Sequence, residues 1–140
     1  MSDRFFLDTN IFVYCFDDSA PKKARRAREL VRQAVVTRKG VISYQVVQEF
    51  FNLALRRFAE PFSAPEAEQY LATVFRPLLA IHSSYALYAG ALRLAARFHL
   101  SLYDSLIVAA GLEAECATLY TEDLQHGQHI NGMLIRNPFS

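Results

Sequence analysis

The sequence predicts an α/β protein in which a mainly parallel sheet is covered by helices on both faces. Short β-like runs alternate with longer helical segments, a pattern typical of parallel sheets. The segment 101–116 is apolar on nearly every side, so we expect a helix buried between a sheet and a second helix. The 140 residues suffice for one domain with its own core, and we expect a single domain over residues 1–140.

A strand and a helix open the chain. Residues 4–7 predict the first strand, which ends at Asp8. After Pro21, small and aliphatic residues recur at 3.6-residue spacing and predict a helix. Gly40 is the expected stop signal of this helix.

The middle of the chain predicts a short strand followed by two helices. Residues 41–43 form the strand, and Ser43 can cap a helix whose apolar face extends from Val46 to Phe58. Ser63 begins a capping box with a proline in the first turn, so a further helix is expected there.

Three more strands and two helices are expected in the second half of the chain. Residues 78–81 predict the third strand, and a helix over 86–98 follows it. Ser101 caps the apolar helix, which extends to about Cys116. Residues 117–120 and 133–135 predict the fourth and fifth strands.

Several carboxylates occur where the predicted fold would bring them to one edge of the sheet. Asp8 follows the first strand, and Glu122 and Asp123 follow the fourth; ligands of such sheets bind outside the carboxyl ends of the strands. Glu49 shares a helix face with apolar residues, and Asp104 opens the most apolar helix. Without a cation, converging carboxylates raise one another's pKa values, whereas Mg²⁺ or Mn²⁺ suits an all-oxygen cluster.

Each acid also has a purely structural interpretation. Asp8 and Asn10 are suited to an Asx turn, and Asp104 lies three residues after Ser101, as in a capping box. Glu49 can be a solvated residue at the edge of its helix face, and the last two acids can be turn residues. The placement of all these acids together is what favours a metal site.

Four segments contain these residues in a characteristic order. They are Asp8-Thr9-Asn10, Glu49 between Gln48 and Phe50, Tyr103 to Ala110, and Thr121-Glu122-Asp123-Leu124 followed by Asn137-Pro138-Phe139. Together they resemble the PIN-domain family, and within it the VapC-type toxins of bacterial toxin–antitoxin pairs. The resemblance spans nearly the whole chain, and its most specific parts are the Asp104 segment and the final Asn-Pro-Phe.

This resemblance implies a fold, an activity and a set of acids. The implied fold is a three-layer α/β/α PIN-like fold with a mainly parallel central sheet of four to five strands. The implied activity is that of a Mg²⁺- or Mn²⁺-dependent endoribonuclease. Asp8, Glu49 and Asp104 match the first three family acids. Asp123 matches the fourth better than its neighbour Glu122, which stays open as a substitute.

We expect these residues to have different roles around the cation. Asp8 and Asp104 are the first choices for direct metal contact, and Glu49 and Asp123 would complete the site. Supporting polar groups come from flanking residues, namely Thr9, Asn10, Thr121 and Glu122. No His or Lys lies within the motifs as an evident general base, which favours water activated by the cation.

The charge distribution suggests where RNA would bind. Fifteen basic and 14 acidic residues give a net charge of +1, which excludes a uniformly basic nucleic-acid binder. Local charge is different, because eight of the 15 basic residues lie in segment 22–39. The candidate RNA contacts are Arg25, Arg26, Arg28, Arg56 and Arg57. The alternative is that the basic segment is the solvated face of an amphipathic helix.

Partners and location follow from the resemblance and from the composition. The resemblance implies an RNA substrate, a cognate antitoxin and a homodimer. The longest apolar stretch, from Leu106 to Leu112, is too short to cross a membrane, and the first residues do not form a signal peptide. We therefore expect a cytoplasmic protein without a membrane association.

Two other functions and two minor features complete the predictions. A Mg²⁺-dependent phosphatase on a related fold and a non-catalytic PIN-like module that binds RNA or protein are the alternatives to a ribonuclease. His126 and His129 have a spacing seen in zinc sites, but no third ligand is evident, so a loop is expected there. Cys15 and Cys116 are expected to be small buried hydrophobic residues.

Overall fold

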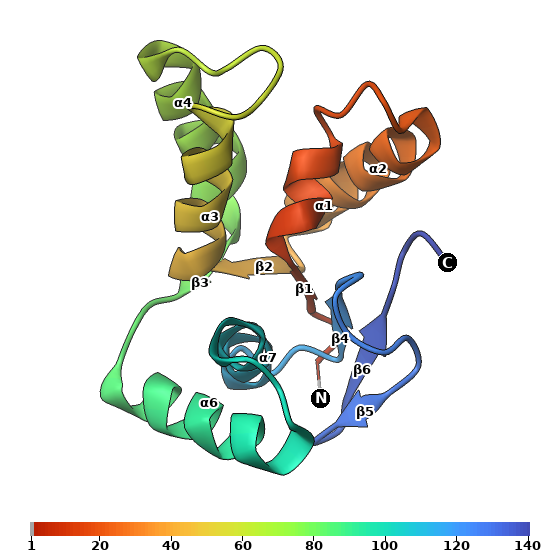
Figure 1. Cartoon of the computed structure of the whole chain (residues 1–140), viewed down its shortest axis with the longest axis vertical. Coiled ribbons are helices and arrows are strands. Elements are labelled where there is room, and N and C mark those ends of the chain that lie inside the picture. Colours follow the sequence, from red (N-terminus) through yellow and green to blue (C-terminus); the bar gives the residue numbers. More distant parts are fainter. Residues whose placement is uncertain (1) are drawn as a thin grey trace.

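A six-stranded sheet with the order β3-β2-β1-β4-β6-β5 forms the middle layer of the computed structural model, which describes residues 2–140 (Figure 1). Its strands are β1 (Phe5–Leu7), β2 (Gly40–Ser43), β3 (Leu79–Ile81), β4 (Thr118–Tyr120), β5 (His129–Ile130) and β6 (Met133–Arg136). All neighbouring strands are parallel except β5 and β6. The predicted α/β fold with a mainly parallel sheet is therefore confirmed. The prediction of four to five strands was too low, because two-residue β5 is too short to show an alternating pattern.

Helices cover both faces of this sheet. They are α1 (Thr9–Tyr14), α2 (Pro21–Thr37), α3 (Tyr44–Ala54), α4 (Ala64–Tyr70), the π-helical turn η1 (Leu71–Phe75), α5 (Arg76–Leu78), α6 (Tyr85–Phe98) and α7 (Leu102–Glu113). Figure 1 shows α1 to α4 on one side and the pair α6 and α7 on the other. No helix within residues 2–140 is long and apolar enough to span a membrane.

The direction of the chain reverses at the centre of the sheet. The strands β1, β2 and β3 are added outward in sequence order, and the chain then returns to place β4 on the other side of β1. Because crossover connections between parallel strands are right-handed, this reversal moves the connecting helices to the opposite face. Ligand sites in such sheets lie at the carboxyl ends of the two strands where the order reverses, which here are β1 and β4.

Helix α7 forms the core of the second helical layer. Its residues 105–111 are all buried, and it packs against β2, β4 and α6. A helix that is covered on every side can be apolar around its whole circumference, as the sequence predicted. The helix ends at Glu113 and not at Cys116, since Glu115 adopts a left-handed conformation with φ of 58°.

Gly40 was wrongly predicted to end helix α2. The helix ends at Thr37, its C-cap Arg38 has a left-handed φ of 59°, and Gly40 is the first residue of β2. A Cβ atom on Gly40 would lie 2.2 Å from the Cβ of Ala34 in α2. The glycine is therefore required by the close approach of β2 to α2 and not by the helix end.

Helix α1 did not appear among the predicted elements. With six residues it is too short to show a helical period in the sequence. It starts because Asp8 is its N-cap, and the Asp8 side chain accepts a hydrogen bond from the Thr9 backbone N–H at 2.7 Å. The turn expected at the end of the first strand is thus the beginning of a helix.

The starts of two other helices, α3 and α4, test the predicted capping residues. Ser43 occupies the N-cap position of α3 without a capping hydrogen bond, so that predicted cap was wrong in its chemistry. Ser63 and Glu66 form the predicted capping box at the start of α4. Helix α3 ends at Ala54, and Phe58 packs against the core from beyond the helix.

Candidate active site

Asp8 lies at the carboxyl end of β1, where the strand order reverses. Its side chain is buried, with 6% of the residue exposed. Oδ1 accepts the Thr9 backbone N–H at 2.7 Å, and Oδ2 accepts the Thr121 hydroxyl at 2.8 Å. Because Thr121 follows β4, this second bond joins the ends of the two central strands.

Glu49 approaches the same place from helix α3. Its Oε1 accepts the Thr9 hydroxyl at 2.6 Å, so Thr9 contacts Asp8 through its backbone and Glu49 through its side chain. Glu49 is half-buried and not solvated at the edge of its helix. Thr9, predicted as a supporting residue, thus links two of the predicted acids.

Asp104 lies in the first turn of α7. Its backbone N–H donates to the Ser101 hydroxyl at 3.2 Å, which caps the helix. The reciprocal half of a capping box, in which the Asp104 carboxylate would accept from the Ser101 backbone, is not among the hydrogen bonds of residues 2–140. The carboxylate lines a pocket with Asp8 and Glu49 instead.

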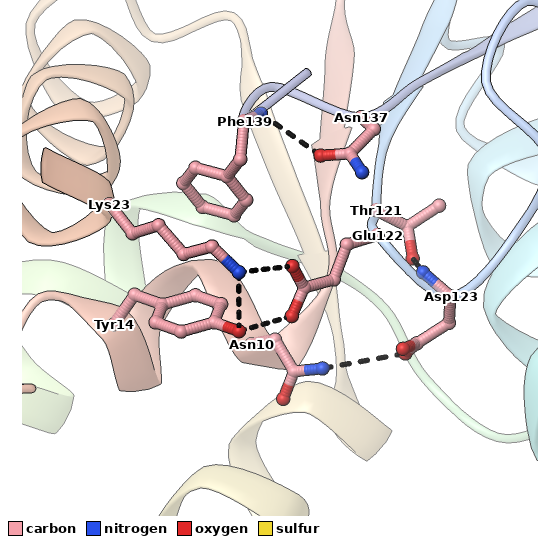
Figure 2. A network of polar contacts seen from close by, with 8 residues as sticks. All are labelled: Asn10, Tyr14, Lys23, Thr121, Glu122, Asp123, Asn137 and Phe139. Atoms are coloured by element: carbon pink, nitrogen blue, oxygen red, sulfur yellow. Dashed lines mark hydrogen bonds and ion pairs between the residues drawn. The ribbon is translucent and has the colours of Figure 1, made fainter. Parts of the chain in front are cut away.

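The loop after β4 separates the two neighbouring acids Glu122 and Asp123 (Figure 2). Glu122 points toward α1 and α2, where it accepts from the Tyr14 hydroxyl and pairs with Lys23 at 3.2 Å. Asp123 has a different partner on α1 and accepts from the Asn10 amide at 3.5 Å. Of the two, Asp123 is the one that lines the pocket.

All four predicted carboxylates line one pocket of about 280 Å³. They come from the end of β1, from α3, from α7 and from the loop after β4. The lining residues are Asp8, Thr9, Asn10, Gln45, Glu49, Asn52, Leu53, Tyr103, Asp104, Ile107 and Asp123. This lining contains no Lys, Arg or His among the residues that the structure describes.

The pocket disfavours ionised carboxyl groups while it contains no cation. Burial raises the pKa of Asp8 to about 7, against the lowering effect of the bonds from Thr121 and Thr9. The carboxylates of Asp123 and Glu49 raise this pKa further. Burial also raises the pKa of Asp123, with Asp104 among the charges that add to the effect.

Comparison with known proteins identifies the family. The family model described as the PIN domain matches residues 5–128, most of the chain. The chain belongs to the PIN-domain family. The proposed resemblance is therefore confirmed over its first four motifs, whereas Asn137-Pro138-Phe139 lies beyond the matched range.

Solved structures of similar fold include a toxin–antitoxin complex and a toxin. A toxin–antitoxin complex from Klebsiella pneumoniae aligns with a TM-score of 0.66 at 21% identity, over 95% of this chain and 96% of the other. VapC20 from Mycobacterium tuberculosis, a toxin that cleaves the sarcin–ricin loop, aligns with a TM-score of 0.62 at 18% identity, over 85% of this chain and 89% of the other. FitAcB from Neisseria gonorrhoeae aligns with a TM-score of 0.63 at 16% identity, over 96% of this chain and 98% of the other. At these identities the alignments show a shared fold. Among curated protein sequences, none matches this chain.

The donor set of this PIN domain fits a divalent cation with a preference for oxygen ligands. The pocket offers carboxylate, amide and hydroxyl oxygens. The pKa values of Asp8 and Asp123 are raised mainly by burial and further by the neighbouring acids, and a bound cation would oppose both effects. Across residues 2–140, no three Asp, Glu, His or Cys side chains are grouped tightly enough to ligate one ion as they stand. The carboxylates therefore share a pocket, and side-chain movements would be needed to bring them onto an ion.

The basic residues of this PIN domain lie outside the pocket. Arg26 contacts Glu29 at 3.6 Å and the Pro138 carbonyl at 3.4 Å, and Arg28 donates to the Cys15 carbonyl at 2.9 Å. These two side chains therefore have a part in the fold. The other candidates are Arg25 on α2 and Arg56 and Arg57 just beyond α3, and they are exposed, as is Arg28.

Sequence reasoning missed three polar residues of the pocket lining. Gln45, Asn52 and Tyr103 line the pocket together with the acids. Gln45 lies four residues before Glu49, on the same face of α3, so helical spacing was a signal that could have found it. Tyr103 directly precedes Asp104 in the segment that resembles the family, and this neighbourhood was the signal that could have found it.

The remaining candidates have structural roles. The imidazole of His126 accepts the Asn137 backbone N–H at 2.9 Å, and His129 lies in β5. The loop predicted around these histidines holds for His126, which lies in a turn, and is wrong for His129, which is the first residue of β5. Cys15 and Cys116 are free and buried, as predicted, and burial raises the pKa of each thiol to about 12.

Proposed function

We propose that this PIN domain is a divalent-cation-dependent endoribonuclease and the toxin of a VapBC-type toxin–antitoxin pair. One observation carries the proposal: carboxylates from four separate elements line one pocket at the point where the strand order reverses. Such a concentration of acid costs stability without a counter-charge, so it is difficult to explain as a device of the fold.

Asp8 and Asp104 are the residues proposed to hold the cation directly, with Glu49 and Asp123 completing the site. When bound, Mg²⁺ or Mn²⁺ supplies a Lewis acid that polarises a phosphoryl oxygen and lowers the pKa of water. The side chain of Asp8 is held on both oxygens, by Thr9 and by Thr121, and so has one preferred orientation. A fixed carboxylate reduces the rearrangement needed when phosphate and water are aligned for hydrolysis.

The supporting residues keep the carboxylates apart and oriented. The Thr121 hydroxyl donates to the Asp8 carboxylate and accepts the backbone N–H of Asp123 at 3.1 Å. It therefore links two acidic residues of the site. Asn10 contacts Asp123 from the first turn of α1. Glu122 is proposed as a structural residue, because its pair with Lys23 fixes the loop that carries Asp123.

RNA is proposed as the substrate and a small antitoxin as the protein partner. The support is the likeness in fold to VapC20, a sarcin–ricin loop-cleaving toxin, and to a toxin–antitoxin complex. A cytoplasmic location and a homodimer belong to the same proposal. Exposed Arg25, Arg56 and Arg57 are its candidate phosphate contacts, because the acidic pocket by itself repels RNA.

The direct test is an RNA cleavage assay with Mg²⁺, with Mn²⁺ and with EDTA. We expect cleavage with either metal and none with EDTA. Asp8→Asn and Asp104→Asn should each reduce the rate at least 100-fold, since removal of one preorganised charged group at a reaction centre costs on the order of 10²–10³. Asp18→Asn is the matched control, because Asp18 is exposed and does not line the pocket.

Two outcomes would contradict this proposal. Cleavage that persists in EDTA or in a clean preparation of Asp104→Asn would show that the pocket does not perform the reaction. Binding of RNA or of a protein without cleavage under any metal condition would favour a non-catalytic module.

A further inference from the structure

Gln45 is a buried polar residue in the wall of the acidic pocket. Only 4% of the residue is exposed. Its Nε2 donates to Glu49 Oε2 at 3.4 Å and to the Tyr103 carbonyl at 3.2 Å. Because Tyr103 immediately precedes Asp104, a single amide group connects the Glu49 carboxylate of α3 to the first turn of α7.

The amide oxygen of Gln45 has no hydrogen-bond partner among residues 2–140. This atom, Oε1, is buried. The amide cannot be turned over to solve this, since Nε2 faces two acceptor oxygens that Oε1 could not bond. Buried polar atoms are nearly always hydrogen-bonded, and Gln45 is one of the residues that line the pocket. A donor for its oxygen can therefore come from the contents of the pocket once the lining side chains shift around a bound ion.

The chemistry of the residue fits this location. A glutamate at position 45 would add another negative charge beside Glu49, whereas the amide offers an acceptor oxygen with no charge. A hydrated divalent cation brings O–H donors on its water molecules, and outer-sphere acceptors of this kind orient the ligands of a metal.

We propose that Gln45 is a positioning residue of the cation site. Its amide nitrogen fixes Glu49 relative to Asp104, and Oε1 accepts a hydrogen bond from a water molecule that hydrates the cation. This inference rests on the proposed function, because it requires a divalent cation in the pocket.

The test compares Gln45→Met with wild type by calorimetric titration of Mn²⁺ in the absence of RNA. Methionine keeps the length and the apolar stem of the side chain and loses both polar groups. We expect Mn²⁺ binding to weaken about 10–100-fold, as is typical when an outer-sphere partner of a metal ligand is removed. The Mg²⁺ concentration for half-maximal RNA cleavage should rise by a similar factor, while the rate at saturating Mg²⁺ changes much less.

The controls separate positioning from folding. Gln48→Met places the same substitution on an exposed position of the same helix and should bind Mn²⁺ like wild type. If Gln45→Met does not fold, Gln45→Asn serves, because the shorter amide cannot reach both Glu49 and Tyr103, and the same weakening is expected.

The possible failures are distinguishable. If wild type binds Mn²⁺ and cleaves RNA, but the folded Gln45 variant binds Mn²⁺ within twofold of wild type, Gln45 has no positioning role. A loss of rate at saturating Mg²⁺ with unchanged Mn²⁺ affinity also overturns the inference. If wild type neither binds Mn²⁺ nor cleaves RNA, the proposed function fails and the inference fails with it.

Discussion

At the scale of single residues, burial of Asp8 determines how this protein responds to pH. The pKa of Asp8 is about 7 in the folded protein, against 3.8 for an ordinary Asp. Between these values the folded state holds a proton that the unfolded state has released. The contribution of Asp8 to stability is therefore fully present below pH 3.8 and is lost as the pH rises through 7.

Asp8→Asn should accordingly stabilise the metal-free protein, and more so at high pH. The variant removes the need to ionise a buried group, while asparagine can still accept a hydrogen bond from Thr9. We expect its advantage over wild type to be larger at pH 8 than at pH 5 by ~1–3 kcal/mol. Urea denaturation at both pH values with EDTA measures this, with Asp18→Asn as the exposed control. An advantage that is equal at both pH values would show that Asp8 does not titrate in this range.

At the scale of secondary-structure elements, the contact between α2 and β2 depends on two small residues. The absence of a side chain at Gly40 lets the strand approach Ala34 of the helix, which is fully buried. Protein interiors are packed as densely as crystals of small organic molecules, so an added methyl group at this contact has no space.

Gly40→Ala should destabilise the protein by about 2–4 kcal/mol, because the new Cβ would overlap that of Ala34 at 2.2 Å. Adding Ala34→Gly should recover part of this loss, reduced by about 1 kcal/mol for a glycine inside a helix. Urea denaturation of the single and double variants measures the coupling. Strictly additive effects would mean that the two residues do not compete for the same space.

Helix α2 also carries three of the arginines that the sequence predicts as RNA contacts. Arg25 and Arg28 are exposed and Arg26 is half-buried, and Arg26 and Arg28 also bond within the protein. Changing all three to glutamine should weaken RNA binding and reduce the slope of log affinity against log salt by roughly one unit per lost phosphate contact. RNA binding is measured with these changes made in Asp104→Asn, without divalent cations and at several salt concentrations, so that the RNA is not cleaved. An unchanged salt slope would show that this helix face is only solvated.

At the scale of the whole molecule, the reversal of strand order assembles the pocket. Its acids are separated by up to 115 positions, from Asp8 to Asp123, and meet only because β1 and β4 are neighbours and α3 and α7 lie on opposite faces. A ligand that binds this assembled pocket binds the folded state alone and stabilises it.

Mn²⁺ should therefore raise the melting temperature of wild type, and more at pH 8 than at pH 5.5. At an ion concentration 100 times the Kd, the stabilisation is about 2.7 kcal/mol. The pH dependence follows because an ion must displace the proton of Asp8, whose pKa is about 7. Thermal unfolding with Mn²⁺ or EDTA at both pH values measures this. An equal increase in Asp104→Asn would place the ion elsewhere.

Periodic features of the sequence predicted the layers of the fold. The repeat of α2, the all-round apolar surface of α7 and the capping box at Ser63 each correspond to an observed element. Short elements were missed because α1 and β5 contain too few residues to form a pattern. Gly40 was misinterpreted because a glycine needed for close packing has the same sequence appearance as one that ends a helix.

The acids themselves were evident from the sequence, since carboxylates after strands and on apolar helix faces are unusual. Which of the two neighbours Glu122 and Asp123 faces the pocket depended on the Tyr14 and Lys23 side chains that hold Glu122. The unpaired oxygen of Gln45 was likewise invisible in the sequence. The sequence alone determined which chemical groups this protein offers and on which helix or strand end they lie, because local spacing predicts the helices and strands. Only the tertiary structure decided their partners, because hydrogen bonds and burial depend on residues that are distant along the chain.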